Sequence, residues 1–300
     1  MSGAQHVPPG ELKTDEALVR RLLTQQFPVW ANLLIARVSA NSTDNDIYRL
    51  GPDMVVRLPR RASAELPIAK ECEWLPHLAP HLPFPISLPI GQGTADDRYP
   101  YCWSVMRWVD GETPPLQVND LAFARDVGAL VKSLRAIDSS GGPQPGAHNF
   151  WRAVPLRVRD SGMRERFNQL SDFSGIRSII SEWDYALTLP EWDQKPVWTH
   201  GDLQRGNLLM LGGSLSGVID WSALAVGDPA GDLALAWSLL GADARAAYRE
   251  VLDVDDATWR RGRAWALIEG VLAFSYYRGK NEVIAEAGER VIATVLSHSA

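Results

Sequence analysis

Cysteine is scarce in this chain: Cys72 and Cys102 are the only two among 300 residues. Two cysteines are too few for a disulfide scaffold or for a zinc site built from cysteines. We therefore expect both to be apolar packing residues in a protein of a reducing compartment.

Long basic runs are also missing. No stretch of Lys and Arg exceeds two residues, and the formal net charge is −6. A nucleic-acid binder ordinarily shows a concentrated positive patch or stripe. The sequence therefore predicts neither a nucleic acid nor an anionic membrane as a partner.

No apolar stretch approaches the ~20 residues that a membrane-spanning helix needs. The first residues, MSGAQHVPPGELKTDEAL, have neither the basic segment nor the apolar segment of a secretory signal. Both features predict a cytoplasmic protein.

The patterns that are present change character near residue 110. With 46% hydrophobic residues, the chain can bury one large core or two modest ones. An α+β lobe is expected over residues 1–109, with short β-rich segments at 33–38, 46–50, 54–59, 86–91 and 101–109 and one helical segment at 63–80. A mainly helical lobe is expected over residues 110–300, with helical patterns at 119–138, 176–187, 232–252, 257–276 and 280–297.

One stretch, VWTHGDLQRGNLLM at 197–210, places polar residues between two apolar runs. After it, the Gly-Gly pair at 212–213 predicts a tight hairpin turn, with Asn207 facing Val218. Asp220 then lies within ~7–8 Å of Asn207. An amide oxygen and a carboxylate are ligands that suit Mg²⁺. The irregular loop carries Asp202 toward the group that the cation holds.

The spacing H-G-D-L-Q-R-G-N, with the aspartate of I-D-W thirteen residues after the asparagine, resembles the aminoglycoside phosphotransferase family, which is related to protein kinases. Further segments resemble the same family in the same order: VVRLPRR (55–61), LPHLAPHLPFP (75–85), YPYCWSVMRWVDGE (99–112) and GDPAGDLALAW (227–237).

The resemblance implies a two-lobed, protein-kinase-like fold that binds ATP or GTP under the β-rich lobe and moves a γ-phosphoryl group to a small-molecule hydroxyl. It implies that Asp202 is the catalytic base and that His200 orients the loop. Asn207 and Asp220 are implied as Mg²⁺ ligands. The implied hinge against the nucleotide base runs from Met106 through Arg107 to Val109.

Two positions depart from the kinase pattern. Arg57 stands where a kinase strand carries lysine, although it can pair the α- and β-phosphates with Glu71 behind it. The phosphate-covering loop at 39–46 contains no glycine, so backbone N–H groups around Ser42 are expected to bind phosphate instead. Either ATP or GTP remains acceptable.

Each assignment has a simpler alternative. His200 can be a hydrogen-bonded core residue, and Asp202 a turn residue. Arg57 and Glu71 can be an ordinary surface pair. The helix N-cap is the expected role of Asp228 and Asp232, with a direct role beside the metal loop as the alternative. Both are held apart from the catalytic set.

A serine hydrolase and a P-loop enzyme find no support, because neither G-x-S-x-G nor a P-loop motif occurs. A non-catalytic pseudokinase that serves as a binding module remains an alternative.

The acceptor is predicted from charge. Residues 111–300 hold 24 Asp and Glu against 19 Lys and Arg, which is five of the six excess negative charges. Within this lobe, Glu269 interrupts the apolar helix AWALIEGVLAF. It faces substrate, pairs with an arginine such as Arg263, or meets solvent. An acidic site favours an acceptor that carries an amine, so aminoglycosides rank ahead of macrolides, and both rank ahead of neutral sugars. A kinase of macrolides, or of a primary metabolite such as an amino alcohol or a sugar, remains the alternative.

Overall fold

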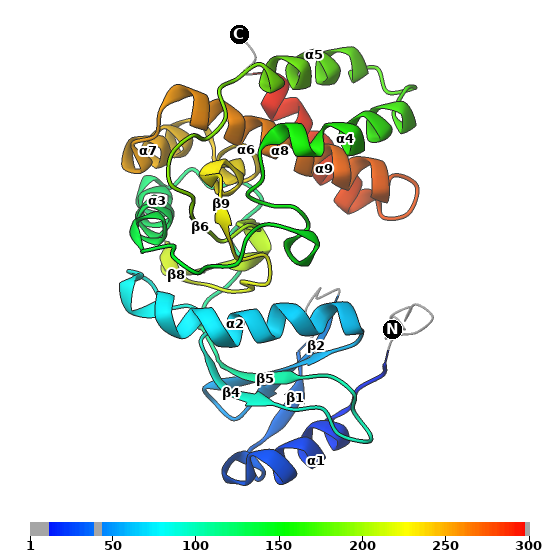
Figure 1. Cartoon of the computed structure of the whole chain (residues 1–300), viewed down its shortest axis with the longest axis vertical. Coiled ribbons are helices and arrows are strands. Elements are labelled where there is room, and N and C mark those ends of the chain that lie inside the picture. Colours follow the sequence, from blue (N-terminus) through cyan, green and yellow to red (C-terminus); the bar gives the residue numbers. More distant parts are fainter. Residues whose placement is uncertain (1–11, 39–43, 298–300) are drawn as a thin grey trace. The chain divides into compact units, whose positions relative to one another are not determined.

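The computed structural model describes residues 12–38 and 44–297. Two compact units make up the chain: Met1–Pro80 with Pro85–Asp110, and His81–Phe84 with Gly111–Ala300 (Figure 1). The sequence pattern put the division between residues 109 and 110. Within the described ranges, no helix combines the length and the apolar character needed to cross a membrane.

The first unit is built on a five-stranded antiparallel sheet in the order β1-β2-β3-β5-β4. Its strands are β1 (Ile35–Arg37), β2 (Asn45–Leu50), β3 (Met54–Pro59), β4 (Pro89–Gly93) and β5 (Trp103–Arg107). All five β-rich segments of the sequence contribute a strand, and the one at 54–59 has the expected bounds. The turn between β2 and β3 uses Gly51 at a φ of 57°, a conformation that glycine adopts without strain.

Helices accompany this sheet: α1 (Glu16–Gln26), α2 (Glu65–Leu78) and the short 3₁₀ segments η1 (Pro28–Trp30), η2 (Ala62–Ala64) and η3 (Ala79–His81). Val19, Leu22 and Leu23 of α1 join a core with Tyr48 and Trp103 of the sheet. The core is therefore apolar side chains from one helix face and from alternating strand positions.

The position of a proline in α2 differs from the sequence prediction, which put Pro67 at or before the helix start. The helix begins at Glu65, so Pro67 is its third residue. The first four N–H groups of a helix have no partner within the helix, so proline is tolerated there.

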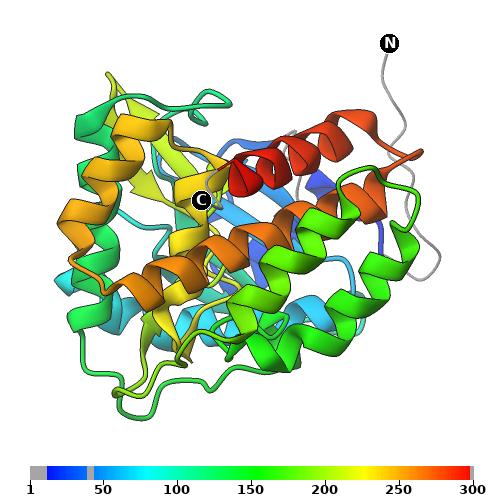
Figure 2. The ribbon, with the colours of Figure 1, turned by 90° about the horizontal axis from the view of Figure 1, so that it is seen from above.

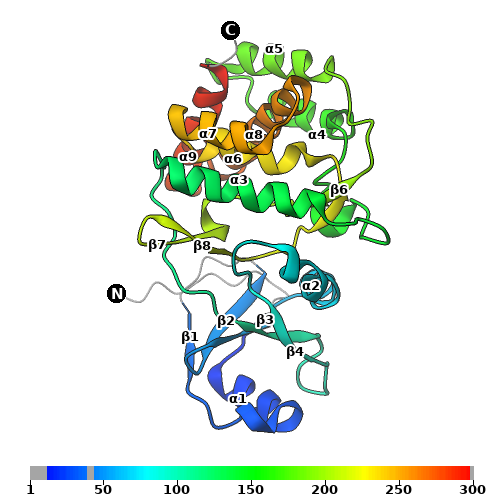
Figure 3. The same cartoon turned by 90° about the vertical axis from the view of Figure 1, so that its left-hand side faces the viewer.

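The second unit is mainly helical. Its helices are α3 (Leu121–Ala136), α4 (Leu156–Gln169), α5 (Ile176–Leu187), α6 (Leu235–Ser238), α7 (Ala242–Leu252), α8 (Asp256–Tyr277) and α9 (Glu282–Leu296). Figure 2 shows α8 and α9 side by side, and their contact is the most extensive between helices here. In Figure 3, α3 lies above the β7–β8 hairpin, against which it packs.

Short strands and 3₁₀ turns carry the polar loops of this unit: β6 (Val197–Thr199), β7 (Leu208–Leu211), β8 (Ser214–Val218), β9 (Ala225–Gly227), η4 (Ala147–Asn149), η5 (Arg205–Asn207) and η6 (Pro229–Ala234). β6 pairs with β9, and β7 pairs with β8. The polar stretch of the sequence therefore leaves β6 and returns as β7.

Two helix predictions for this unit were wrong. The sequence pattern missed α4, whose buried residues are only Leu156, Met163 and Phe167, too few for a clear apolar stripe. The expected helix at 232–252 is interrupted between α6 and α7. A side chain at Gly241 would collide with Asn119, and its backbone is extended, so the helix restarts there.

The hairpin register also differs from the prediction. The Gly-Gly turn is present, with φ of 61° at Gly212 and 89° at Gly213. However, Leu208 rather than Asn207 faces Val218, because the register shifts between Leu209 and Met210. A bulge adds one residue to one strand of a pair, and the turn-based count could not include it.

Candidate active site

The loop after β6 begins at Gly201, whose backbone is tightly constrained. Gly201 has a φ of 80°, and a Cβ there would lie 2.3 Å from the carbonyl oxygen of Ala223. Only glycine combines this left-handed conformation with such a close approach. Gly201 therefore fixes the direction in which the chain leaves β6.

His200 is fully buried and binds within the loop rather than facing solvent. Its Nε2 donates to the carbonyl of Ile219 at 3.2 Å, and its Nδ1 accepts from the backbone N–H of Asp202 at 3.3 Å. The ring also packs on Trp221, with centroids 4.6 Å apart. These contacts make His200 an orienting residue between the two segments.

Asp232 holds the backbone of the same loop, so its predicted role as a helix cap was wrong. Its carboxylate accepts from the backbone N–H groups of His200 and Gly201, both at 2.8 Å. Burial raises the pKa of this carboxyl. In the sequence, Asp232 stands out as an acid four residues after Asp228. Asp228 does cap η6, because its side chain accepts a hydrogen bond from the backbone N–H of Ala230.

Asp202 is half-buried, and its carboxylate is held by side chains of its own loop. Oδ2 accepts from Nε2 of Gln204 at 2.8 Å and from Nδ2 of Asn207 at 3.2 Å. The same Asn207 nitrogen donates to the backbone carbonyl of Asp202 at 2.8 Å. The loop therefore positions Asp202 through both its backbone and its carboxylate.

The two residues expected to bind metal are linked through the hairpin. The backbone carbonyl of Asn207 accepts from Ile219, the neighbour of Asp220, at 2.9 Å. Because the Asn207 side-chain nitrogen is engaged with Asp202, the amide oxygen is left to serve as a ligand. Asp220 has a φ of 57°, which is uncommon outside glycine and is frequent at functional sites.

This donor set fits magnesium. An amide oxygen and one carboxylate are hard oxygen donors, and Mg²⁺ is usually held by one or two carboxylates together with phosphates and water. Among the described residues, no three His, Cys, Asp or Glu side chains gather into a metal site of their own.

Glu269 of α8 pairs with Arg152, not with Arg263 and not with solvent alone. Nη1 of Arg152 lies 2.7 Å from the Glu269 carboxylate, while its Nη2 lies 3.2 Å from Oδ1 of Asp202. Arg263 instead pairs with Glu182. The structure therefore brings Glu269 to the loop through an arginine that the sequence did not single out.

The charges around Arg152 shift the pKa values of both Glu269 and Arg152. Burial raises the pKa of Glu269 to about 7, although Arg152 opposes the shift and Asp202 adds to it. Burial disfavours the charged guanidinium of Arg152, but Glu269 and Asp202 outweigh burial, so its pKa is raised. Arg152 therefore remains a cation between two carboxylates.

The backbone around Arg152 is strained and well anchored. Phe150, Trp151 and Ala153 have φ values of 56°, 58° and 60°. Asn149 accepts the backbone N–H of Arg152 at 3.1 Å and donates to its carbonyl at 3.1 Å. Non-glycine residues keep such conformations only where surrounding contacts impose them, often at functional sites. The guanidinium is thus placed beside Asp202 by the fold.

In the first unit, an ion pair at Arg57 links β3 to α2. Arg57 of β3 and Glu71 of α2 form a buried ion pair, with Nη1 2.7 Å from Oε2. Glu71 is fully buried, which contradicts the alternative of an ordinary surface pair. Nη1 of Arg57 also lies 3.9 Å from the sulfur of Met106.

The other residues that the sequence predicted to bind nucleotide are Arg107, Val109 and Ser42. Arg107 ends β5 with an exposed side chain, and its backbone N–H donates to Leu88 at 2.8 Å. Val109 is buried just beyond the strand. Ser42 lies outside the described residues.

Comparison with known proteins identifies the family. The model of the phosphotransferase enzyme family matches residues 36–265, more than two thirds of the chain. This chain belongs to that family, whose members are enzymes. No curated protein sequence matches it significantly.

Solved structures of phosphotransferases have the same fold. The GDP and kanamycin complex of APH(2")-IIia superposes with a TM-score of 0.75 at 18% identity, over 95% of this chain and all of that one. The macrolide 2'-phosphotransferase MphH from Brachybacterium faecium superposes with a TM-score of 0.64 at 18% identity, over 92% of this chain and 97% of that one. The expected kinase-like fold is thereby confirmed.

Proposed function

We propose that this protein transfers the γ-phosphoryl group of ATP or GTP to a hydroxyl group of a small molecule. The observation that carries the proposal is the arrangement of the 200–207 loop, where His200, Asp232 and Asn207 hold Asp202 in place. Phosphoryl transfer depends mainly on positioning and on charge neutralisation. A fixed carboxylate beside ligands suited to magnesium supports this chemistry.

Each residue has a proposed task. Asp202 would accept or steer the proton of the acceptor hydroxyl. Asn207 and Asp220 would hold Mg²⁺, which when bound neutralises charge on the phosphate oxygens. Arg57, held by Glu71, would bind the phosphates that are not transferred.

Nucleotide binding by this fold is supported by the solved relatives, some of which contain GDP, ADP or ATP. The predicted contacts at Met106, Arg107 and Val109 and at Ser42 remain proposals for this chain. We leave ATP and GTP as equal candidates, and parallel titrations with both nucleotides decide between them.

The first acceptor candidate is a hydroxylated molecule that carries an amine, such as an aminoglycoside. Two acidic side chains, Asp202 and Glu269, lie beside one guanidinium, Arg152, and Glu269, whose pKa is about 7, is partly ionised at neutral pH. The relative with kanamycin bound supports this class. An amine of the acceptor would interact with the uncompensated charge.

A second candidate, a macrolide or a neutral polyol, is favoured by a specific contact. Arg159 of α4 is close enough to Arg152 to lower its own pKa further, after the larger effect of burial. Its Nη1 donates to the carbonyl of Phe150 at 3.0 Å. Two cations would balance the two carboxylates and leave a site for oxygen-rich acceptors.

A transfer screen tests the proposal. The purified chain is incubated with Mg²⁺ and labelled ATP or GTP against kanamycin, gentamicin, a macrolide, glucosamine and glucose. Transfer to any acceptor supports the proposed function, and the ranking separates the two acceptor candidates. Binding of nucleotide without transfer or hydrolysis would favour a pseudokinase instead.

A further inference from the structure

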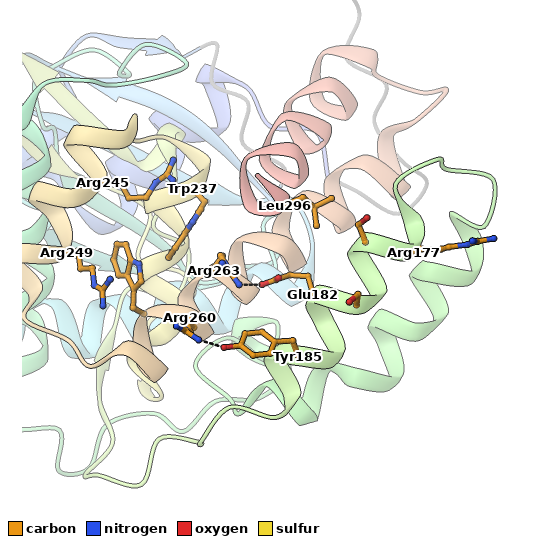
Figure 4. A pocket seen from close by; sticks show the side chains of 12 residues that line it. Arg177, Glu182, Tyr185, Trp237, Arg245, Arg249, Arg260, Arg263 and Leu296 are labelled. Atoms are coloured by element: carbon orange, nitrogen blue, oxygen red, sulfur yellow. Dashed lines mark hydrogen bonds and ion pairs between the residues drawn. The ribbon is translucent and has the colours of Figure 1, made fainter. Parts of the chain in front are cut away.

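A cavity lies in the helical unit, and its lining contains none of the residues assigned to the candidate active site. It has a volume of about 920 Å³ and is formed by α5, α6, α7, α8 and α9 (Figure 4). No residue of the 200–207 loop lines it. Its polar lining is dominated by arginine: Arg177, Arg245, Arg249, Arg260 and Arg263.

The charge of this lining is the reverse of the charge of the whole chain. Five arginines and one carboxylate, Glu182, line the cavity, whereas the chain has a net charge of −6. Glu182 pairs with Arg263, and Asp256 pairs with Arg249 from outside the lining. Even with both pairs counted, a positive excess remains.

Contacts hold the guanidinium groups of Arg245, Arg249, Arg260 and Arg263 in place. Nε of Arg245 donates to the carbonyl of Ala236 at 2.7 Å, and Arg260 donates to the hydroxyl of Tyr185. In Figure 4 the Arg260–Tyr185 and Arg263–Glu182 contacts cross from α8 to α5. A group ordered in advance loses less entropy when it binds a ligand.

Aromatic rings form another part of the wall. The guanidinium carbon of Arg245 lies 5.8 Å from the centroid of the Trp237 ring, and that of Arg249 lies 5.3 Å from the Trp259 ring. The two tryptophan rings pack with centroids 4.7 Å apart, and Leu296 adds apolar surface. The lining therefore combines cations with flat apolar faces.

The lining brings like charges close together. Arg245 and Arg249 are one helical turn apart, a spacing at which like charges destabilise a helix. Burial also lowers the pKa of Arg245.

We propose that this cavity binds a small organic anion that carries at least two negatively charged oxygen groups and a flat or apolar portion. Guanidinium groups bind phosphate, sulfonate or carboxylate oxygens through paired hydrogen bonds. The volume falls within the ~300–1,000 Å³ of small-molecule sites. This binding function is separate from the phosphoryl transfer proposed above.

Two matched probes test the chemistry of the ligand. Naphthalene-1,5-disulfonate has a flat ring and two anionic groups, whereas 1,5-dihydroxynaphthalene has the ring without the charges. In calorimetric titrations of the full chain, the disulfonate should bind at least ~10-fold more tightly than the diol, and added salt should weaken it. Inorganic pyrophosphate, which has charge without a ring, should bind more weakly than the disulfonate.

Variants place the binding in this cavity. Arg260→Glu and Arg249→Glu should each weaken disulfonate binding at least ~10-fold, because each converts an attraction into a repulsion. Arg125→Glu, an exposed position on α3 outside the lining, makes the same change of charge and should leave binding unaltered. Circular dichroism confirms that each variant is folded, and Arg260→Ala provides a milder substitution if reversal disturbs the helix.

Three results would overturn the proposal. The first is no saturable binding of the disulfonate at millimolar concentration. The second is equal binding of the disulfonate and the diol. The third is loss of binding in Arg125→Glu as large as in Arg260→Glu, which would mean that the overall charge of the protein and not this cavity governs the interaction.

Discussion

Arg152 donates a hydrogen bond to Asp202 across 3.2 Å, so the proposed base shares its Oδ1 atom with a cation from a distant part of the sequence. Removal of that cation by Arg152→Met should shift the preference between acceptors. The ratio of kcat/KM for kanamycin to that for a neutral acceptor should rise at least ~5-fold, since a unit charge within a few ångströms changes binding by at least ~1 kcal/mol.

Arg152→Lys is the matched control, because it keeps the charge and should keep the ratio near that of the parent. Arg152→Met also leaves Glu269 without its partner, so the double variant Arg152→Met with Glu269→Gln guards against loss of folding. A ratio that stays constant, or that moves toward neutral acceptors, contradicts the electrostatic role.

The elevated pKa of Glu269 predicts a pH dependence of stability. Burial raises that pKa to about 7 from an ordinary value of 4.5, with Arg152, Asp202 and Asp232 as the charged groups nearby. Between these two values the folded state binds more protons than the unfolded state, so the free energy of unfolding falls as pH rises from about 4.5 to about 7. The decrease is on the order of 3 kcal/mol at most.

Glu269→Gln removes the titration and should flatten this part of the stability curve. Denaturant unfolding of the parent and the variant at pH 5, 6, 7 and 8 measures the difference. If the two free energies of unfolding run parallel across the range, Glu269 does not titrate in the manner inferred.

Substitutions of Asn207 and of Asp220 should affect nucleotide binding and turnover differently. Asp220→Ala should weaken Mg²⁺-dependent nucleotide binding more than Asn207→Ala, because a carboxylate brings formal charge and an amide does not. Asn207→Ala should lower turnover more than affinity, since Asn207 also holds Asp202 at 2.8 Å and 3.2 Å. Equal Mg-nucleotide affinity in both variants and the parent would contradict the metal assignment.

Asp232 should matter for folding. Asp232→Asn replaces an acceptor of two backbone N–H groups with an amide whose nitrogen cannot accept, so one buried N–H loses its partner at a cost of ~1–3 kcal/mol. Asp243→Asn, at an exposed position of α7, is the control. Unfolding in urea measures both, and equal stability of both variants with the parent would show that the loop does not depend on Asp232.

The sequence predicted those parts of the protein in which local patterns agree with the final structure. The five β-rich segments and the Gly-Gly turn follow from residue spacing alone, and so does the loop from His200 to Asn207. Where an insertion broke the count, as at the bulge beside Met210, the predicted register was off by one residue. Strands of 4 and 5 residues are too short for the alternation of apolar residues to reveal a bulge.

The contacts that the sequence did not predict join residues far apart in the chain. Arg152 and Glu269 are 117 positions apart, and nothing in either segment identifies the partner of the other. The sequence predicted Asp232 to be a helix cap, because an aspartate before an apolar run is typical of helix caps. Its true contacts with the 200–201 backbone depend on β6 and η6 packing together, which only the tertiary structure provides.

The most direct test of the account compares the parent with Asp202→Asn in the transfer of labelled γ-phosphate from Mg-ATP or Mg-GTP to the best acceptor of the screen. Asparagine preserves the shape of the side chain but cannot take a proton, so turnover should fall at least ~100-fold while nucleotide affinity stays within about twofold of the parent. Turnover within tenfold of the parent, with the variant folded and nucleotide bound, would contradict the central role given to Asp202.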